Sequence, residues 1–256
     1  MDHSAPTTVI ADGPRAEDLR VKVFADGADL EGIRKLAADP RIAGFTTNPT
    51  LMTKAGVTNY EEFARQAVEI VGERPISFEV FADDFAEMAR EARLIAAWGD
   101  SIYVKIPVTD TSGNSSAELI RELTADGVKL NVTGLFTLEQ VATVAAALEG
   151  GAPACVSLFA GRIADAGVDP VPIVIEAVAL LEPLADVELI WASPREMLNL
   201  VQADETGCHI ITVTHDLLAK LDLLGKDLTE FSLDTVKMFH RDAVSAGYRL
   251  EDVVDD

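Results

Sequence analysis

Apolar and polar residues alternate along this chain in two interleaved patterns, one with the spacing of helices and one with that of strands. Amphipathic stretches with apolar residues at helical spacing predict helices at 60–71, 85–98, 138–149 and 171–184. Strand-like runs between such stretches are expected at 21–26, 44–48, 76–81, 102–108, 130–136, 155–161, 187–193 and 209–215. This order of strand followed by helix predicts an α/β fold, a single closed (β/α)₈ barrel with a short N-terminal extension and C-terminal helices.

An open, doubly wound parallel sheet is the alternative fold. Such a sheet normally carries a glycine-rich turn after its first strand, and the segment FADGADLEG lacks the G-x-G-x-x-G spacing. A length of 256 residues fits one barrel domain. We therefore expect a flexible extension at 1–20 and a catalytic barrel domain at 21–256.

Within the predicted strands, alternate residues differ in character, because side chains of a strand point to opposite faces in turn. In IYVKIPV, Ile102 and Val104 share one face, and Tyr103 and Lys105 share the other. The other strands repeat this pattern of one apolar face and one face with polar residues near its C-terminal end. In a barrel these ends converge on the mouth. An antiparallel sheet with a solvated face would show a similar alternation, but it would not account for the intervening helices.

Charge and cysteine content restrict the function classes. Lys plus Arg total 21 and Asp plus Glu total 43, a net charge of −22 that argues against general nucleic-acid binding. No apolar run reaches about 18 residues, so no membrane span is expected. Cys155 and Cys208 lack partners at metal-ligand spacing, and buried free thiols are typical of a reducing cytoplasm. No histidine or carboxylate cluster has metal spacing, so we expect no metal.

Lys105 is the first candidate for chemistry, because it lies inside an apolar run. Burial disfavours an unpaired ammonium group, and the neutral amine of a lysine is the nucleophile that attacks a ketone. Asp26 and Glu79 are expected to face the same cavity and would supply a base and an acid–base group. The alternatives are a lysine held in a salt bridge, and carboxylates that only neutralise it.

Several segments, taken in order, resemble the transaldolase and fructose-6-phosphate aldolase family. The segments are FADGADL, GFTTNPTL, VKIPVT, SLFAGRIAD, WASPRE and GCHIITVTHDLLAKL. The resemblance runs from about Val21 to Arg249, nearly the whole chain. It implies an enzyme that exchanges a dihydroxyacetone unit between sugar phosphates through a Schiff base on Lys105, with no cofactor. It also implies that Asp26 is the base, and that Glu79 and Thr133 hold the catalytic water.

The resemblance further implies a set of substrate-binding residues: Thr46, Asn48, Asn131, Ser157, Phe159, Arg162, Ser193 and Arg195. The two arginines would hold the phosphate, since a guanidinium can bind it in a bidentate manner. Pro194 stands where the family usually has an aromatic residue, which puts the place of Arg195 in doubt. Glu79 and Phe159 resemble the transaldolase branch, whereas the aldolase branch typically has Gln and Tyr there.

Two other expectations concern partners and alternatives. The apolar face of the C-terminal segment DTVKMFHRDAVSAGY suggests a homo-oligomer that binds small sugar phosphates and neither nucleic acid nor membranes. The runner-up activity is an aldolase that releases free dihydroxyacetone. A barrel that binds sugar phosphates without catalysis is the alternative from another class. The histidines, His215 among them, are expected to have surface or packing roles.

Overall fold

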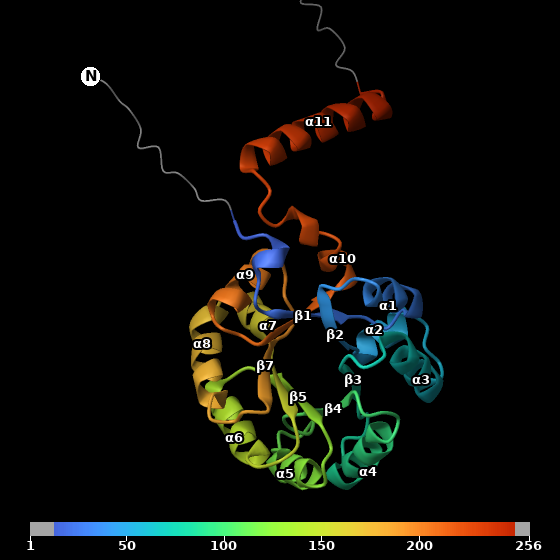
Figure 1. Cartoon of the computed structure of the whole chain (residues 1–256), viewed down its shortest axis with the longest axis vertical. Helices are drawn as coiled ribbons and strands as arrows, with labels where there is room; N and C mark the ends of the chain where they lie inside the picture. Colours follow the sequence, from blue (N-terminus) through green and yellow to red (C-terminus); the bar gives the residue numbers. More distant parts are fainter. Residues whose placement is uncertain (1–12, 249–256) are drawn as a thin grey trace, which may run out of the picture. The chain divides into compact units, whose positions relative to one another are not determined.

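The computed structural model describes residues 13–248 and contains a closed barrel of parallel strands in sequence order (Figure 1). The strands are β1 (Lys22–Asp26), β2 (Ile42–Thr46), β3 (Ile76–Glu79), β4 (Ile102–Pro107), β5 (Leu130–Leu135), β6 (Ala154–Leu158), β7 (Val187–Trp191) and β8 (Ile210–Thr214). β1 pairs with both β2 and β8, which closes the ring. The (β/α)₈ barrel expected from the sequence is confirmed.

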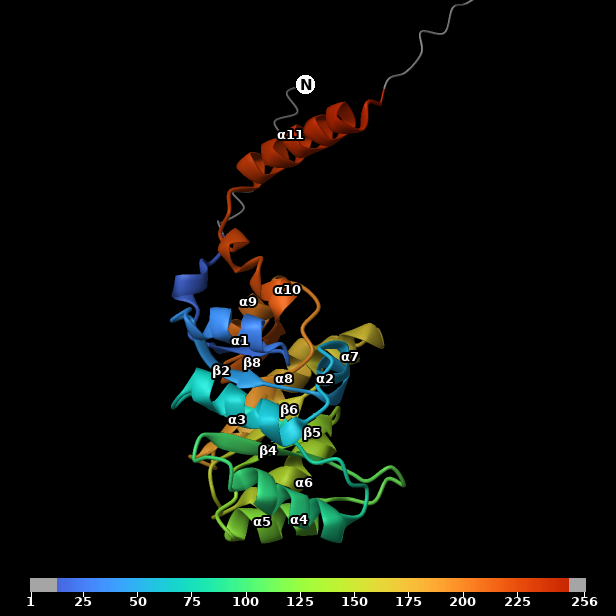
Figure 2. The ribbon, with the colours of Figure 1, turned by 90° about the vertical axis from the view of Figure 1, so that its right-hand side faces the viewer.

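Helices follow the strands and surround the barrel, as the side view also shows (Figure 2). They are α1 (Leu30–Ala37), α2 (Pro49–Lys54), α3 (Tyr60–Val71), α4 (Phe85–Ala96), α5 (Ala117–Ala125), α6 (Leu138–Leu148), α7 (Ala160–Asp165), α8 (Pro170–Leu181), α9 (Leu198–Glu205) and α10 (His215–Leu218). A further helix, α11 (Leu228–Ala246), follows α10 in the chain. Short 3₁₀ turns lie at Ala16–Asp18 and Leu221–Leu223. Asp or Asn side chains cap the first turns of α1 to α4, and Thr137 and Gln140 form a capping box on α6.

The sequence predicts the strand starts better than the strand ends. The range 155–161 is wrong at its end, because Phe159 leaves the sheet to precede α7. The range 44–48 is displaced, since β2 ends at Thr46 and Asn48 caps α2. The strands predicted to end at residues 81 and 193 stop at Glu79 and Trp191. In each case the residues beyond the strand form the loops at the barrel mouth.

An apolar layer of side chains lies below a polar one in the barrel interior. The lower layer is apolar and buried, and consists of Phe24, Cys155, Ile190 and Ile210 with Ala43 and Tyr103 packed against them. Gly44 admits the Phe24 ring, because a Cβ atom at Gly44 would lie 2.5 Å from it. Two residues further along β1, β4, β6 and β8, the interior residues are Asp26, Lys105, Ser157 and Thr212. The polar faces of the strands therefore meet above an apolar floor.

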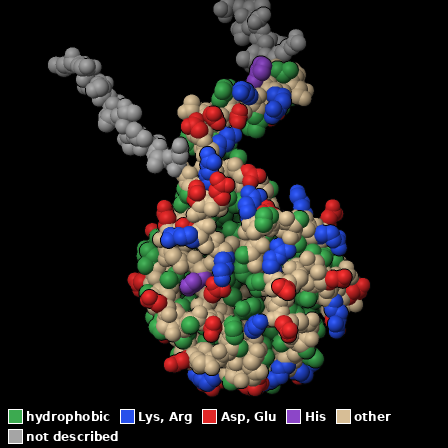
Figure 3. Space-filling model, viewed as in Figure 1, with side chains coloured by type: hydrophobic (Ala, Val, Ile, Leu, Met, Phe, Trp, Pro, Cys, Tyr) green, Lys and Arg blue, Asp and Glu red, His purple; other side chains and the backbone are tan. Residues whose placement is uncertain are grey.

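The described chain forms two compact units. Leu19–Leu221 contain the barrel, and residues 13–18 with 222–248 form the other unit. α11 in the second unit has no buried residue in its 19 positions, and its exposed apolar side chains include Phe239 and Val244. Figure 3 shows acidic and basic side chains interspersed over the visible face of the barrel.

The limits of the predicted domains stay a prediction, and residues 1–12 of the expected extension lie outside the described residues. Among residues 13–248, no helix is long and apolar enough to cross a membrane.

Candidate active site

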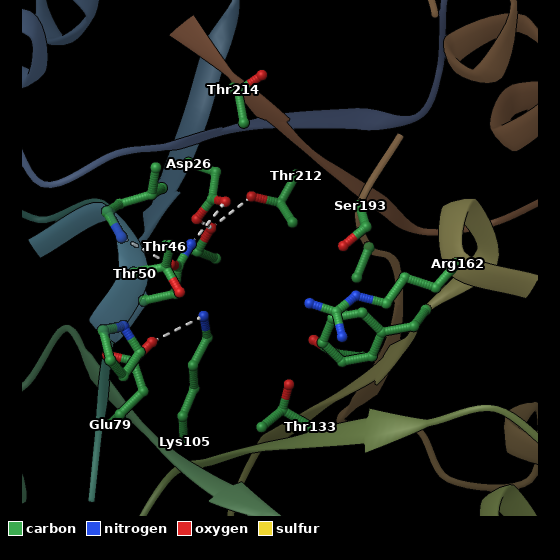
Figure 4. Close-up of a pocket in the computed structure, with 16 residues that line it drawn as sticks. Asp26, Thr46, Thr50, Glu79, Lys105, Thr133, Arg162, Ser193, Thr212 and Thr214 are labelled. Atoms are coloured by element: carbon green, nitrogen blue, oxygen red, sulfur yellow. Dashed lines mark hydrogen bonds and ion pairs between the residues drawn. The ribbon is translucent and has the colours of Figure 1, made fainter. Parts of the chain in front are cut away.

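A cavity of about 430 Å³ opens at the C-terminal ends of the strands (Figure 4). Most of the residues expected at the site from the sequence line it: Asp26, Thr46, Asn48, Glu79, Lys105, Thr133, Ser157, Phe159, Arg162 and Ser193. Pro49, Thr50, Leu51, Ala192, Thr212 and Thr214 complete the lining. Figure 4 shows Lys105 and Glu79 on one side, and Arg162 and Ser193 on the opposite side.

Lys105 projects from β4 and meets Glu79 of β3. The two residues are paired in the strand register, so their side chains rise at the same level of the barrel. Lys105 Nζ lies 3.1 Å from Glu79 Oε1 and also donates to the carbonyl oxygen of Thr47. Lys105 is 9% exposed and Glu79 is 7% exposed. The contact puts a carboxylate within reach of the Lys105 amine, so Glu79 can exchange a proton with it when the amine attacks a carbonyl.

The electrostatic surroundings of Glu79 suit proton exchange. Burial raises the pKa of Glu79, whereas the nearby Lys105 and the Thr47 hydroxyl lower it and the charge of Asp26 raises it further; the net shift is upward. A raised pKa brings a carboxyl group closer to the range in which acid–base catalysis is efficient at neutral pH. The Tyr60 hydroxyl donates to the Glu79 carbonyl oxygen at 3.0 Å and fixes the end of β3.

Asp26 is the last residue of β1, and its side chain lines the cavity. Its Oδ1 accepts a hydrogen bond from the Thr46 hydroxyl at 2.7 Å, and its Oδ2 accepts one from Asn48 Nδ2 at 3.2 Å. The Thr46 hydroxyl has one proton, which it donates to Asp26. In the hydrogen bond between the Thr46 and Thr212 hydroxyls, Thr212 is therefore the donor. The Asn48 amide oxygen meanwhile accepts from Leu51 N–H. These contacts hold the Asp26 carboxylate in one orientation.

Asn131 is buried in the barrel interior and is not among the residues that line the cavity. It is fully buried, with its Nδ2 3.0 Å from Ser77 Oγ and its Oδ1 accepting from Ser157 Oγ at 2.7 Å. Asn131 is the register partner of Lys105. The three side chains form a polar link from β3 through β5 to β6 at the level of Lys105.

Arg162 reaches the cavity from α7. Its guanidinium carbon lies 5.3 Å from the centroid of the Phe159 ring, and Phe159 stacks on Phe136 with centroids 5.6 Å apart. The aromatic pair directs the guanidinium into the cavity, opposite Lys105 (Figure 4). A planar cation at this place can bind a phosphate through two parallel hydrogen bonds.

Ser193 faces Arg162 from the loop after β7 and has a positive φ of 59°. A non-glycine residue in this region is uncommon and marks local backbone strain. The Ser193 carbonyl oxygen packs so closely on Gly161 that a Cβ atom there would lie 1.6 Å from it. Gly161 N–H also donates to the Ala192 carbonyl oxygen at 3.2 Å. This close approach brings α7 and the β7 loop together around Arg162.

Comparison with known proteins identifies the relatives of the chain. The family described as Transaldolase/Fructose-6-phosphate aldolase matches residues 23–256. The chain belongs to this family. A "Probable transaldolase" from Dehalococcoides mccartyi is 35% identical over 202 residues, which cover 78% of this chain and 90% of the relative. Another from a Thermoanaerobacter species is 35% identical over 218 residues, covering 85% and 95%.

Solved structures with similar folds are more distant in sequence. A 2,3-dimethylmalate lyase has a TM-score of 0.52 at 15% identity and covers 94% of this chain and 89% of that one. A putative phosphonomutase from Burkholderia cenocepacia has a TM-score of 0.55 at 12% identity, covering 87% and 94%. At these identities the likeness concerns the barrel fold alone.

Arg195, like Asn131, is a predicted site residue that does not line the cavity of this transaldolase-family chain. Its guanidinium contacts the Asp165 carboxylate on α7, with Nε–Oδ1 at 3.0 Å and Nη2–Oδ2 at 2.5 Å. Its side chain is 48% exposed. Arg195 is therefore linked to the Arg162 side of the cavity through α7, which carries both Asp165 and Arg162. That Arg195 binds phosphate stays a prediction, to which this placement adds no support.

Sequence reasoning missed Thr50, Thr212 and Thr214, whose side chains Figure 4 shows around the upper part of the cavity. Thr212 and Thr214 share a face of the last strand, and this spacing was the available signal. Thr50 lies in the first turn of the short helix α2, where the period of two of the strands does not apply. Within residues 13–248, no group of three or more His, Cys, Asp or Glu side chains could hold a metal.

Proposed function

We propose that this enzyme transfers a dihydroxyacetone unit from a ketose phosphate to an aldose acceptor through a Schiff base on Lys105. The observation that carries the proposal is the buried Lys105 amine, 3.1 Å from Glu79 and facing a cavity with Arg162 on its far side. A buried amine next to a proton acceptor is the arrangement that a carbonyl-attacking lysine requires. The distant arginine suits the phosphate end of an extended sugar.

The first half-reaction makes the Schiff base and breaks the carbon chain. The Lys105 amine attacks the C2 ketone, and loss of water gives an iminium; Glu79, with a water held by Thr133, moves the protons. Asp26 takes the C4 hydroxyl proton, the C3–C4 bond breaks, and its electron pair enters the iminium to form an enamine. An aldose phosphate leaves. The raised pKa of Glu79 and the fixed orientation of Asp26 support these roles.

The second half-reaction runs these steps in reverse with another aldehyde. The enamine carbon attacks the acceptor carbonyl, Asp26 returns its proton to the new hydroxyl, and water releases the ketose from Lys105. Thr46, Asn48, Ser157 and Ser193 shape the surface for the sugar hydroxyls, and Asn131 supports Ser157 from within the barrel. No cofactor is needed, because the iminium accepts the electron pair. The exchange belongs to carbohydrate metabolism, and a cytoplasmic location accords with two buried free cysteines.

Two measurements test the proposal. Borohydride added with fructose 6-phosphate should attach a reduced three-carbon unit to Lys105, located by peptide mass mapping. Labelling at Lys22 or Lys129 would contradict it. A coupled assay with and without an acceptor aldose then separates transfer from cleavage. Product that depends on the acceptor supports the transferase, whereas equal release of free dihydroxyacetone without acceptor supports the aldolase.

We also propose that the protein is a homo-oligomer assembled through α11. The exposed fractions of Phe239 and Val244 on this helix are 63% and 65%. An apolar helix surface of this kind is typical of an interface. Light scattering should give the mass of an oligomer, and Phe239→Asp should lower that mass. A monomeric wild-type protein would exclude the assembly without affecting the proposed reaction.

A further inference from the structure

His215 occupies a tight place between the last strand and the first strand-to-helix turn. It is the first residue of α10 and directly follows Thr214, which lies on the same side of the cavity as Asp26 (Figure 4). Its ring fills the space beside two glycines. A Cβ atom at Gly27 would lie 2.3 Å from His215 Nε2, and one at Gly32 would lie 2.6 Å from His215 Cε1.

The backbone conformation does not require glycine at either position. Neither Gly27 nor Gly32 is among the glycines with positive φ, so an alanine could adopt the same backbone angles. At Gly27 the three nearest atoms that would meet a Cβ all belong to the His215 ring. At Gly32 the ring shares this place with the Asp29 carboxylate, which caps α1. The glycine at position 27 therefore serves to admit the imidazole.

Gly27 matters because it directly follows Asp26. The Gly27 N–H donates to the Thr46 carbonyl oxygen at 3.0 Å, next to the Thr46 hydroxyl that holds the Asp26 carboxylate. Glycine restricts the backbone less than other residues do, so contacts with other side chains must hold the backbone at Gly27 in place. We propose that His215 is a positioning residue: its ring wedges the turn at Gly27 and Gly32 and thereby fixes Asp26 for removal of the C4 hydroxyl proton.

The surroundings of the ring indicate that it acts by shape rather than by proton transfer. His215 Nε2 is buried and has no hydrogen-bond partner within residues 13–248. Burial lowers the pKa of His215, against the opposing charges of Asp29, Asp26 and Asp216, which keeps the ring neutral over a wider range of pH. A neutral ring whose Nε2 has no partner packs against the backbone of the two glycines and takes no part in proton transfer.

The proposal rests on the proposed function and separates the two steps of that reaction. Schiff-base formation depends on Lys105 and Glu79, whereas cleavage of C3–C4 depends on the orientation of Asp26. Borohydride reduction with fructose 6-phosphate distinguishes the steps, because the Lys105 peptide carries the intact hexose phosphate before cleavage and a three-carbon unit after it. The ratio of the two adducts at a fixed early time therefore reports the cleavage step.

The first experiment compares this ratio in variants. Asp26→Asn should accumulate the intact adduct, and His215→Ala should shift the ratio in the same direction by about tenfold to 100-fold, the scale of a misplaced catalytic group. Total labelling of Lys105 should stay near the wild-type amount. His209→Ala is the matched control, since His209 precedes β8 at its other end and accepts a hydrogen bond from Leu189 N–H. It should leave the ratio unchanged.

The second experiment tests the contact itself. Gly27→Ala should slow cleavage by about tenfold or more, because the methyl group and the ring cannot share the same space. In the His215→Ala background the space is vacant, so adding Gly27→Ala should change the ratio less than about twofold. If His215→Ala does not fold, His215→Asn provides the same comparison with a smaller cavity.

The outcomes are distinct. A wild-type enzyme without an adduct on Lys105 overturns the proposed function. If the wild type is labelled, and His215→Ala lowers the total labelling but leaves the adduct ratio unchanged, only the positioning role is overturned. His215 would then be a structural residue. Equal effects of Gly27→Ala in both backgrounds would also overturn it.

Discussion

The two ends of the cavity are built in different ways. At the Lys105 end, hydrogen bonds join Glu79 to Lys105 and Thr47, and others join Asp26 to Thr46 and Asn48. These side chains come from the neighbouring strands β1 to β4 and from the residues directly after β2. At the Arg162 end, the guanidinium lies on an aromatic ring and is carried by α7, outside the sheet. A reacting group must be fixed to a fraction of an ångström, whereas a phosphate needs charge at the correct distance. Substitutions at the Lys105 end should therefore lower the activity more than substitutions at the Arg162 end.

The largest effect is expected from Lys105→Arg. A guanidinium stays protonated and cannot form an imine, so both transfer and cleavage should fall by roughly 10⁴-fold or more, as expected for loss of a nucleophile. Borohydride trapping with fructose 6-phosphate should disappear as well. Retention of labelling in this variant would show that another lysine carries the sugar, and the contrast between the two ends would lose its basis.

Glu79→Gln should act at the same end with a smaller effect. The transferase rate should fall by roughly 10²–10⁴-fold, the scale of losing an acid–base group, with cleavage to free dihydroxyacetone comparatively intact. Both products are measured with and without acceptor. A parallel loss of the two activities would make Glu79 a general electrostatic member of the site and remove the main support for transfer over cleavage.

The pH dependence provides a check on the same residue. Because burial raises the pKa of Glu79, its carboxylate takes up a proton at a higher pH than an ordinary glutamate does. Transferase activity that needs the ionised carboxylate should fall as the pH decreases through this raised pKa. A rate profile for wild type and Glu79→Gln should show this acidic limb in the wild type and its loss in the variant. The same limb in both proteins would assign it to another group.

Arg162→Ala tests the second end. Loss of a cation that pairs with the substrate phosphate should cost about 2–4 kcal/mol, seen as a higher KM for phosphorylated sugars and little change for unphosphorylated analogues. Lys105 should still be trapped at saturating substrate. If kcat falls and phosphate discrimination survives, Arg162 belongs with the chemistry and the two ends are not separate.

The smallest effect is expected from Arg195→Ala, measured beside Asp165→Ala. The pair is about half exposed, and such pairs contribute about 0–1 kcal/mol. Each variant should raise KM for phosphorylated substrates less than about fivefold, and the two changes should resemble each other because both release α7. A large effect of Arg195→Ala alone would mean that Arg195 leaves Asp165 and binds the phosphate directly.

The barrel and the polar end of the site follow from local patterns in the sequence. Period-two alternation places Lys105 on the interior face of β4, and the same rule applied to β1 and β3 brings Asp26 and Glu79 to it. These predictions need no knowledge of loops, because neighbouring strands of a closed barrel fix the relative height of their side chains. The strand register pairs Glu79 with Lys105.

The remaining features depend on contacts between distant segments, which periodicity does not encode. Asp165 attracts Arg195 across the gap between α7 and the β7 loop, and no spacing in the sequence relates these two residues. Phe159 and Ser193 lie beyond their strands, so the strands were predicted too long at both places. The space that a side chain at Gly27 would need is taken by the ring of His215, 188 residues further along the chain.

The apolar layer beneath Lys105 has a consequence for the order in which substrates come and go. Phe24, Cys155, Ile190 and Ile210 are buried below the polar residues and close the barrel under the cavity. In the proposed reaction, donor and acceptor must therefore use the same opening at the barrel mouth. The first aldehyde has to leave before the second can enter, so the floor of the barrel imposes the ping-pong order of a two-step exchange.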